Sequence, residues 1–341
     1  MDLTGAELAR RYAEQVVLPL VEQRWPGLPC AAARLGSGSD VLGLDDPTSR
    51  DHDWGLRLTL LVPADLVAGV DAHLADRLPD DVGGLPTRFA TTWEPEVRHR
   101  VEVADAATFA RSRLGVDASR ELTLDDWLGL TGQAVLEVVG GPVFVDTLGE
   151  LTRIRERLEW YPDELWRHLV AVDWARLAQE LPFVGRTAQR GDDLGSRVIT
   201  ARLVGVAMHL GFLLERRWPP YAKWRGTCFA ALPEACDALA PLAGSLAADD
   251  WHDRESGLVE GLAHLGEVQR RRGLPTPAAV VEPFWDRPFR TVSERVVTEL
   301  EASVTDPAVR ALPRGVGSVE QWSDNVDVLT RVDARAPGGF R

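Results

Sequence analysis

The amino-acid sequence predicts an α+β protein in which an N-terminal mixed sheet with flanking helices precedes an all-helical C-terminal domain. Short strand-like runs alternate with helical patterns up to about residue 118, and long helical patterns follow. Prolines and glycines fall mainly between these later patterns. A length of 341 residues also favours two domains. We therefore expect domains at 1–118 and 119–330, with a flexible tail at 331–341.

The chain opens with a helix predicted over residues 5–24. Thr4 and Glu7 have the spacing of a capping box, and apolar residues recur after them at helical intervals. The run "CAAARL" at 30–35 then predicts a short strand that ends at Gly36.

The rest of the first domain alternates between strands and helices. Apolar and β-branched runs predict strands, proline closes the first of them, and Gly115 ends the last helix. The expected elements are a strand at 51–62, a helix at 64–78, strands at 87–93 and 97–104, and a helix at 105–115.

The second domain consists of helical patterns separated by breaker residues. They lie at 123–130, 152–160, 163–181, 194–218, 255–272 and 291–304. A brief segment at 142–146, "PVFVD", is expected to be extended.

Composition and charge narrow the functional class. The chain is 45% hydrophobic and 26% charged, as in ordinary globular proteins. A net charge of −14 disfavours a long nucleic-acid partner. The sequence contains no long uncharged apolar run, so we expect no membrane association and a cytoplasmic location. The three cysteines fit buried thiols in a reducing compartment.

The acidic motif "DHD" at 51–53 stands at the start of a predicted strand. In an extended strand Asp51 and Asp53 share one face and lie about 6.5 Å apart. Two carboxylates so close repel unless a cation lies between them, and Mg²⁺ prefers such oxygen ligands. The alternative is a pair of aspartates on a hydrated surface.

Two further segments could complete a site for an anion and a metal. Gly36 and Ser37 end a predicted strand, where backbone amides and a hydroxyl can approach a triphosphate closely. Glu102 offers a third carboxylate on a later strand. The alternative for Glu102 is a surface ion pair with Arg98 or Arg100, which share its face.

Lysine use is unusual. Among 38 basic residues only Lys223, within "WPPYAKW", is a lysine. A compact ammonium suits a phosphate oxygen differently from a guanidinium. Lys223 is therefore either a phosphate ligand or a chance exception to a strong bias toward arginine.

Together "LGS", "DHDW" and "VEV" resemble the signature of the DNA polymerase beta-type nucleotidyltransferase superfamily over roughly 1–115. The segments "GSGSDVLG", "SRDHDWG", "YPDELW", "GDDLGS" and "PPYAKW" look like a bacterial nucleotidyltransferase-like family of unknown function, and they span most of the chain. Within this pattern His52 stands where an apolar residue is usual, and Glu102 replaces the commoner aspartate.

The resemblance implies a helical domain that closes over a nucleotide bound to the mixed sheet. It implies transfer of a nucleoside monophosphate from an NTP, with ATP expected, to a hydroxyl of a small molecule or protein, releasing pyrophosphate. The catalytic residues, which also hold two Mg²⁺ ions, would be Asp51, Asp53 and Glu102. The nucleotide-binding residues would be Gly36, Ser37, Ser39, Arg50, Tyr221 and Lys223.

Two other functions remain open at this point. The same fold could bind a nucleotide as a catalytically inactive sensor or regulatory protein. In the helical half, the spacing of Arg202 and His209 is similar to that of ribonuclease-like toxin domains.

Overall fold

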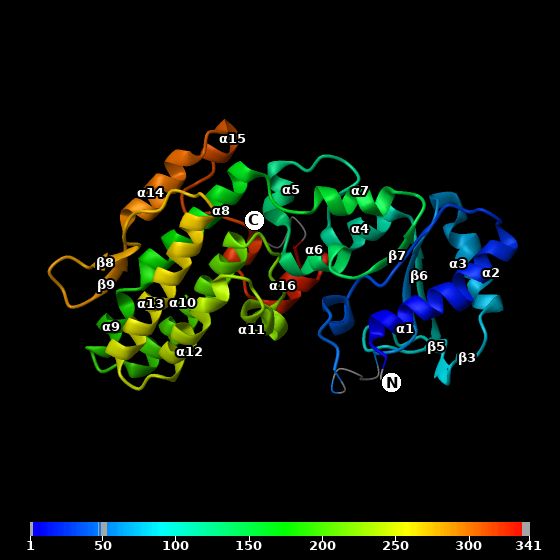
Figure 1. Cartoon of the computed structure of the whole chain (residues 1–341), viewed down its shortest axis with the longest axis horizontal. Helices are drawn as coiled ribbons and strands as arrows, with labels where there is room; N and C mark the ends of the chain where they lie inside the picture. The colour runs from blue at the N-terminus through cyan, green and yellow to red at the C-terminus, as the bar shows by residue number, and fades with distance from the viewer. Residues whose placement is uncertain (1–2, 47, 49–52, 336–341) are drawn as a thin grey trace. The chain divides into compact units, whose positions relative to one another are not determined.

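The computed structural model describes residues 3–46, 48 and 53–335, and the chain divides into two compact units (Figure 1). The first unit comprises Met1–Thr123, Ala134–Glu159 and Arg331–Arg341; the second comprises Leu124–Gln133 and Trp160–Thr330. The predicted fold class is confirmed, because the first unit contains a mixed sheet and the second is built mainly from helices.

A five-stranded sheet forms the centre of the first unit. Its order is β5 (Arg88–Phe89), β6 (Arg98–Ala104), β2 (Arg57–Leu61), β1 (Ala31–Ala33) and β7 (Val143–Asp146). The β2 and β6 strands are parallel, and all other pairs are antiparallel. The extended segment predicted at 142–146 thus pairs with β1, which extends this unit past residue 118.

Helices flank this sheet. Thr4 caps the first helix as predicted, but among the described residues the Glu7 carboxylate accepts from Arg11 and does not complete the capping box. Thr4 accepts a hydrogen bond from the Glu7 N–H at the start of the first helix, and Gly115 ends α4 with φ +80°. The other elements of the unit are α1 (Gly5–Tyr12), η1 (Ala13–Val17), α2 (Leu18–Arg24), η2 (Ser39–Leu42), η4 (Ala64–Leu66), α3 (Val67–Arg77), β3 (Asp81–Val82), β4 (Leu85–Pro86), α4 (Ala106–Leu114), α7 (Glu150–Arg157) and α17 (Val332–Arg335). The helix predicted at 5–24 is thus one run with a π-helical turn, η1, inside it.

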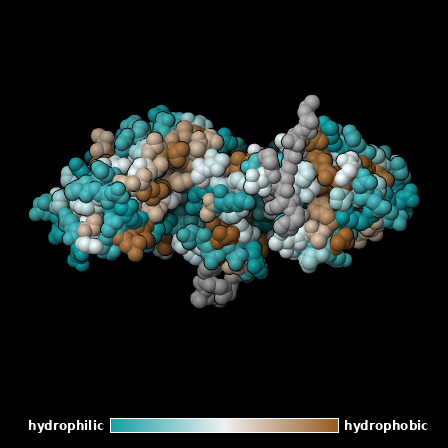
Figure 2. Space-filling view, turned by 90° about the horizontal axis from the view of Figure 1, so that it is seen from below, coloured by the Kyte–Doolittle hydropathy of each residue, from teal (hydrophilic) through white to brown (hydrophobic). Residues whose placement is uncertain are grey.

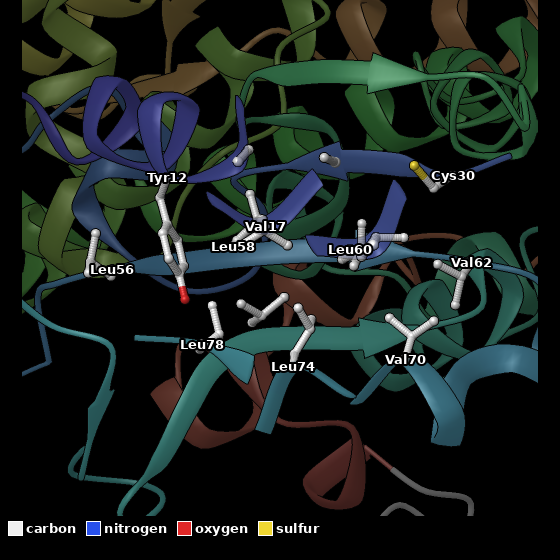
Figure 3. Close-up of a cluster of buried hydrophobic side chains, with 14 of the residues drawn as sticks. Tyr12, Val17, Cys30, Leu56, Leu58, Leu60, Val62, Val70, Leu74 and Leu78 are labelled. Atoms are coloured by element: carbon white, nitrogen blue, oxygen red, sulfur yellow. The ribbon is translucent and has the colours of Figure 1, made fainter. Parts of the chain in front are cut away.

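One face of the sheet carries the hydrophobic core of this unit. Figure 3 shows Leu58 and Leu60 of β2 between Tyr12 from α1 and Leu74 from α3. Because side chains alternate along a strand, Arg57 and Thr59 face the opposite side. In the register of the parallel pair, Thr59 is the partner of Glu102, so the two share that side.

The strand predicted at 51–62 is shorter than expected. The β2 strand begins at Arg57, and Asp53 lies in a turn, so the prediction that Asp53 lies on a strand face is wrong. Asp53 is bound instead by Thr92, and Gly55 packs so closely that a Cβ would lie 3.0 Å from the Phe89 ring. Asp51 lies outside the described residues.

The segment after residue 330 includes ordered helix. Residues 332–335 form α17, and Arg335 donates a hydrogen bond to the Arg113 carbonyl at 2.9 Å. The predicted tail from 331 therefore begins with a docked turn, and residues 336–341 lie outside the description.

The second unit packs its helices around α10. Its helices and strands are α5 (Leu124–Gly129), α8 (Asp163–Glu180), α9 (Phe183–Ala188), α10 (Asp193–Leu214), α11 (Ala222–Ala230), η5 (Ala235–Ala238), α12 (Leu239–Ala247), α13 (Trp251–Arg271), β8 (Val281–Pro283), β9 (Arg290–Val292), α14 (Glu294–Ser303), α15 (Pro307–Arg310), η6 (Val319–Gln321) and α16 (Val326–Thr330). The boundary between the units falls within α6 (Gly132–Val139).

Among the described helices, only α10 has the length and hydropathy to cross a membrane. It is largely buried, with 61% of its most apolar window inside the protein, as expected of a core helix.

On the face shown in Figure 2, hydrophilic residues predominate and hydrophobic residues form small scattered groups.

A buried polar cluster ties three elements of the second unit together. His209 of α10 lies with Nδ1 2.6 Å from the Asp173 carboxylate of α8, and its Nε2 lies 3.5 Å from Glu320 of η6. Gln321 donates to the other Asp173 oxygen at 2.8 Å. Burial alone would lower the pKa of His209, but Asp173 and Glu320 outweigh it and raise the pKa to about 9.

The second unit should therefore lose stability as pH rises from about 6.5 to 9. A histidine whose pKa is raised on folding contributes fully below its unfolded pKa and loses that contribution as pH passes its folded pKa. The free energy of unfolding should fall by an amount on the order of a few kcal/mol over this pH range. Thermal unfolding of the full chain at pH 6, 7.5 and 9 measures it.

The variant His209→Gln should lack this fall, whereas His252→Gln, at an exposed histidine, should keep it. Parallel pH profiles for the parent and His209→Gln would contradict the charged state assigned to the cluster.

Candidate functional site

The "GSGSD" loop after β1 is shaped by a buried ion pair. Arg34 Nε and Nη2 donate to the two Asp40 carboxylate oxygens at 2.7 and 2.9 Å, and both residues are buried. Arg34 also donates to the Leu35 and Ser37 carbonyls. Removing one member of a buried pair costs about 3–5 kcal/mol, so the pair holds the loop in one conformation.

Two glycines are required by this loop. Gly36 has φ +81° and Gly38 has φ +142°. Residues with a side chain rarely adopt these backbone conformations. A Cβ on Gly38 would also lie 2.2 Å from Asp40 Oδ1 and 2.6 Å from Arg34 Nη2. The ion pair and the glycines therefore specify the same loop shape.

Three consecutive backbone N–H groups of this loop have no hydrogen-bond partner in the part of the chain that the structure describes. The Gly36 N–H donates to the Glu137 carbonyl at 2.8 Å, so it is not available to a ligand. The N–H groups of Ser37, Gly38 and Ser39 form no hydrogen bond with any residue the structure describes. Backbone N–H groups without a protein partner are available as donors to a bound anion.

A guanidinium lies beside these amides. Arg57 Nη2 is 3.4 Å from the Ser37 hydroxyl, and a Cβ on Gly38 would lie 3.5 Å from Arg57 Nη1. Within the described part of the chain, no carboxylate forms an ion pair with Arg57. The half-buried Arg57 thus adds to the loop a positive charge that forms no ion pair among the described residues.

The environment of Arg57 is unfavourable to its charge. Burial lowers the pKa of Arg57 to about 9, and the nearby positive charge of Arg34 acts in the same direction. Asp40 and Glu102 oppose this shift, and Arg113 adds to it. Arg57 remains charged at neutral pH, where a bound anion would relieve the repulsion.

Glu102 of β6 is paired with an arginine that the sequence did not suggest. Both of its carboxylate oxygens lie 2.6 Å from Arg113 Nη2, and Arg113 Nε lies 3.7 Å from Glu137. The alternative pairing with Arg98 or Arg100 does not form, because Arg98 contacts Asp71 and Arg100 binds backbone carbonyls. Asp105 caps α4 through the Thr108 N–H.

Asp53 anchors a neighbouring turn. Its carboxylate accepts hydrogen bonds from the N–H and the hydroxyl of Thr92, at 2.6 and 2.7 Å. Asp53 therefore fixes the position of Thr92.

The other predicted site residues are distributed as follows. Ser39 begins η2, two residues after Ser37. Tyr221 and Lys223 belong to the second unit, at the start of α11, where the Lys223 ammonium lies 4.8 Å from the Trp224 ring centroid. Their nucleotide-binding roles stay predictions. Arg50, Asp51 and His52 lie outside the described residues.

No three His, Cys, Asp or Glu side chains among the described residues form a cluster suited to a metal ion. The expected set includes Asp51, which lies outside the described residues, so the magnesium site stays a prediction.

Sequence reasoning missed Arg34, Arg57 and Arg113, the cations around the loop. Arg57 carried a usable signal, since it is a charged residue at the start of an apolar strand, "RLTLLV". Arg34 and Arg113 gave no such signal because arginine is frequent throughout the chain.

The ribonuclease-like pair does not form a site. Arg202 is exposed and paired with Glu180, whereas His209 is buried against Asp173. The two side chains therefore serve separate structural contacts.

Comparisons with known proteins match this chain only distantly. The family model described as "Domain of unknown function (DUF4037)" matches residues 127–225, a minority of the chain that includes Tyr221 and Lys223. No curated protein matches significantly. A similar solved structure is that of a nucleotidyltransferase-like protein from Exiguobacterium sibiricum 255-15. It has 14% identity and a TM-score of 0.36, over 77% of this chain and 78% of that chain. A likeness this distant assigns neither a site nor an activity.

Proposed function

We propose that the first unit binds a nucleoside triphosphate and transfers its nucleoside monophosphate to a hydroxyl of a small molecule or protein, releasing pyrophosphate. One observation carries the proposal: the amides of Ser37–Ser39, which have no hydrogen-bond partner among the described residues, lie beside the Arg57 guanidinium. Arg57 has no carboxylate partner among the described residues, and a bound triphosphate would supply the negative charge to pair with it.

This transfer also requires a site for Mg²⁺, and the acidic residues could provide it. Asp51, Asp53 and Glu102 are the proposed ligands of two Mg²⁺ ions. Asp53 and Glu102 already accept hydrogen bonds, but a carboxylate has about four lone-pair positions, so both could also ligate a metal. Bound magnesium would stabilise charge on the attacking and leaving oxygens.

The chain's own groups then have distinct roles in the transfer. The acceptor oxygen forms a bond to the α-phosphorus, and the bond from that phosphorus to the bridging oxygen of the β-phosphate breaks. The electron pair of the broken bond leaves with pyrophosphate, and the hydroxyl proton passes to a nearby carboxylate or to water. The loop amides and Arg57 hold the phosphates that become pyrophosphate and neutralise their growing charge.

A second candidate is a nucleotide sensor that transfers nothing. The observation that favours it is the pairing of both Glu102 oxygens with Arg113. If Glu102 serves only as an ion-pair partner, the loop could still bind phosphates without catalysing their transfer.

Replacing Arg57 by methionine should raise the melting temperature at pH 7.5 and abolish stabilisation by inorganic tripolyphosphate. Methionine keeps an apolar stem but removes a charge that folding disfavours. Because the pKa of Arg57 is lowered on folding, that penalty is complete below about pH 9 and fades as pH rises further. Thermal unfolding with and without tripolyphosphate measures both effects.

In the parent, tripolyphosphate at 100 times its Kd should add about 2.7 kcal/mol of stability. Arg98→Met, at an exposed arginine paired with Asp71, should retain this gain. An undiminished gain in Arg57→Met would remove Arg57 from the site.

The variant Glu102→Gln should separate transfer from binding. We expect it to slow pyrophosphate release from ATP and Mg²⁺, with water as acceptor, by orders of magnitude, because its amide is a poorer metal ligand than a carboxylate. Tripolyphosphate stabilisation without Mg²⁺ should persist. Glu96→Gln, at an exposed acid of the same hairpin, should release pyrophosphate like the parent.

A parent that binds ATP but releases no pyrophosphate would favour the sensor. Equal release by the parent and Glu102→Gln would refute a catalytic role for Glu102.

A further inference from the structure

An exposed tryptophan stands at the corner of the turn between β5 and β6. Thr91 and Glu94 exchange backbone hydrogen bonds, of 2.9 Å from the Thr91 N–H and 3.3 Å from the Glu94 N–H, which close a tight turn. Trp93 lies within this turn and is 56% exposed. Large exposed aromatic side chains on ordered turns are frequent binding residues.

Hydrogen bonds made by the side chains of Asp53 and Arg100 hold this turn. The Asp53 carboxylate binds the N–H and hydroxyl of Thr92. Arg100 donates to the carbonyls of Phe89, Glu94 and Glu96, at 2.7, 3.0 and 2.6 Å. Fixing a binding side chain before the ligand arrives lowers the entropic cost of binding.

Arg57 joins the turn to the phosphate loop. Its guanidinium carbon lies 5.0 Å from the Trp93 ring centroid, and its Nη2 lies 3.4 Å from the Ser37 hydroxyl. No other cation or ring among the described residues stacks on Trp93. An anion at the loop and a flat ring on the indole would therefore be neighbours around one guanidinium.

We propose that Trp93 stacks on the base of the nucleoside triphosphate whose phosphates bind at Ser37–Ser39. The inference rests on the proposed function and names the part of the site that recognises the nucleoside. Stacking uses the π-face that every base has, so the site binds all four NTPs with only modest differences. Trp93 is thus a binding residue for the base, distinct from the phosphate ligands.

Calorimetric titration of the full chain with ATP and with inorganic tripolyphosphate tests this role. Trp93→Ala should weaken ATP binding roughly 5- to 150-fold and leave tripolyphosphate binding unchanged. Trp93→Phe should recover most of the ATP affinity. Trp285→Ala, at an 83% exposed tryptophan of the second unit, should bind both ligands like the parent.

Fluorescence gives a second readout that does not depend on the alanine variant. ATP should quench the parent more than Trp93→Phe, since one stacked indole has been removed.

The outcomes separate this inference from the proposed function. Equal ATP binding by the parent, Trp93→Ala and Trp93→Phe would overturn the stacking role alone. Equal losses of ATP and tripolyphosphate in Trp93→Ala would also overturn it, because Trp93 would then act through Arg57. A parent that binds neither ligand would refute the proposed function as well.

Discussion

The ion pair between Arg34 and Asp40 is the contact on which the candidate site depends. It is buried at the end of β1, and it bends residues 35–40 into a loop whose positive φ angles only glycine tolerates well. The same arginine also binds the Leu35 and Ser37 carbonyls. The bonds that shape the loop therefore use its carbonyls and leave the amides of Ser37–Ser39 unpartnered among the described residues.

Charge around this loop is unevenly balanced. Arg34 is neutralised by Asp40, and Arg113 is neutralised by Glu102 with Glu137 nearby. Arg57 has no comparable partner in the described part of the chain, and burial keeps its pKa low. Replacing Arg57 by an uncharged residue should increase the stability of the fold. The presence of this charge therefore fits a binding role better than a structural one.

Local patterns predicted the parts of the fold that local interactions determine. The Thr4 cap and the Gly115 helix end follow from spacing and residue type alone. The predicted start of β2 was wrong because a long-range contact determines where the strand begins. Asp53 lies in a turn and binds Thr92, which is 39 residues away in sequence. For the site, the sequence indicated the "GS" loop and Glu102, but the cations around them depend on pairings between distant segments.

The most direct measurement is a crystal structure of the full chain with a non-hydrolysable ATP analogue and Mg²⁺. We expect phosphate oxygens within hydrogen-bond distance of the Ser37–Ser39 amides and of the Arg57 guanidinium. Phosphates bound elsewhere, with these amides and Arg57 making no contact to the nucleotide, would contradict the assignment of this loop as the triphosphate site.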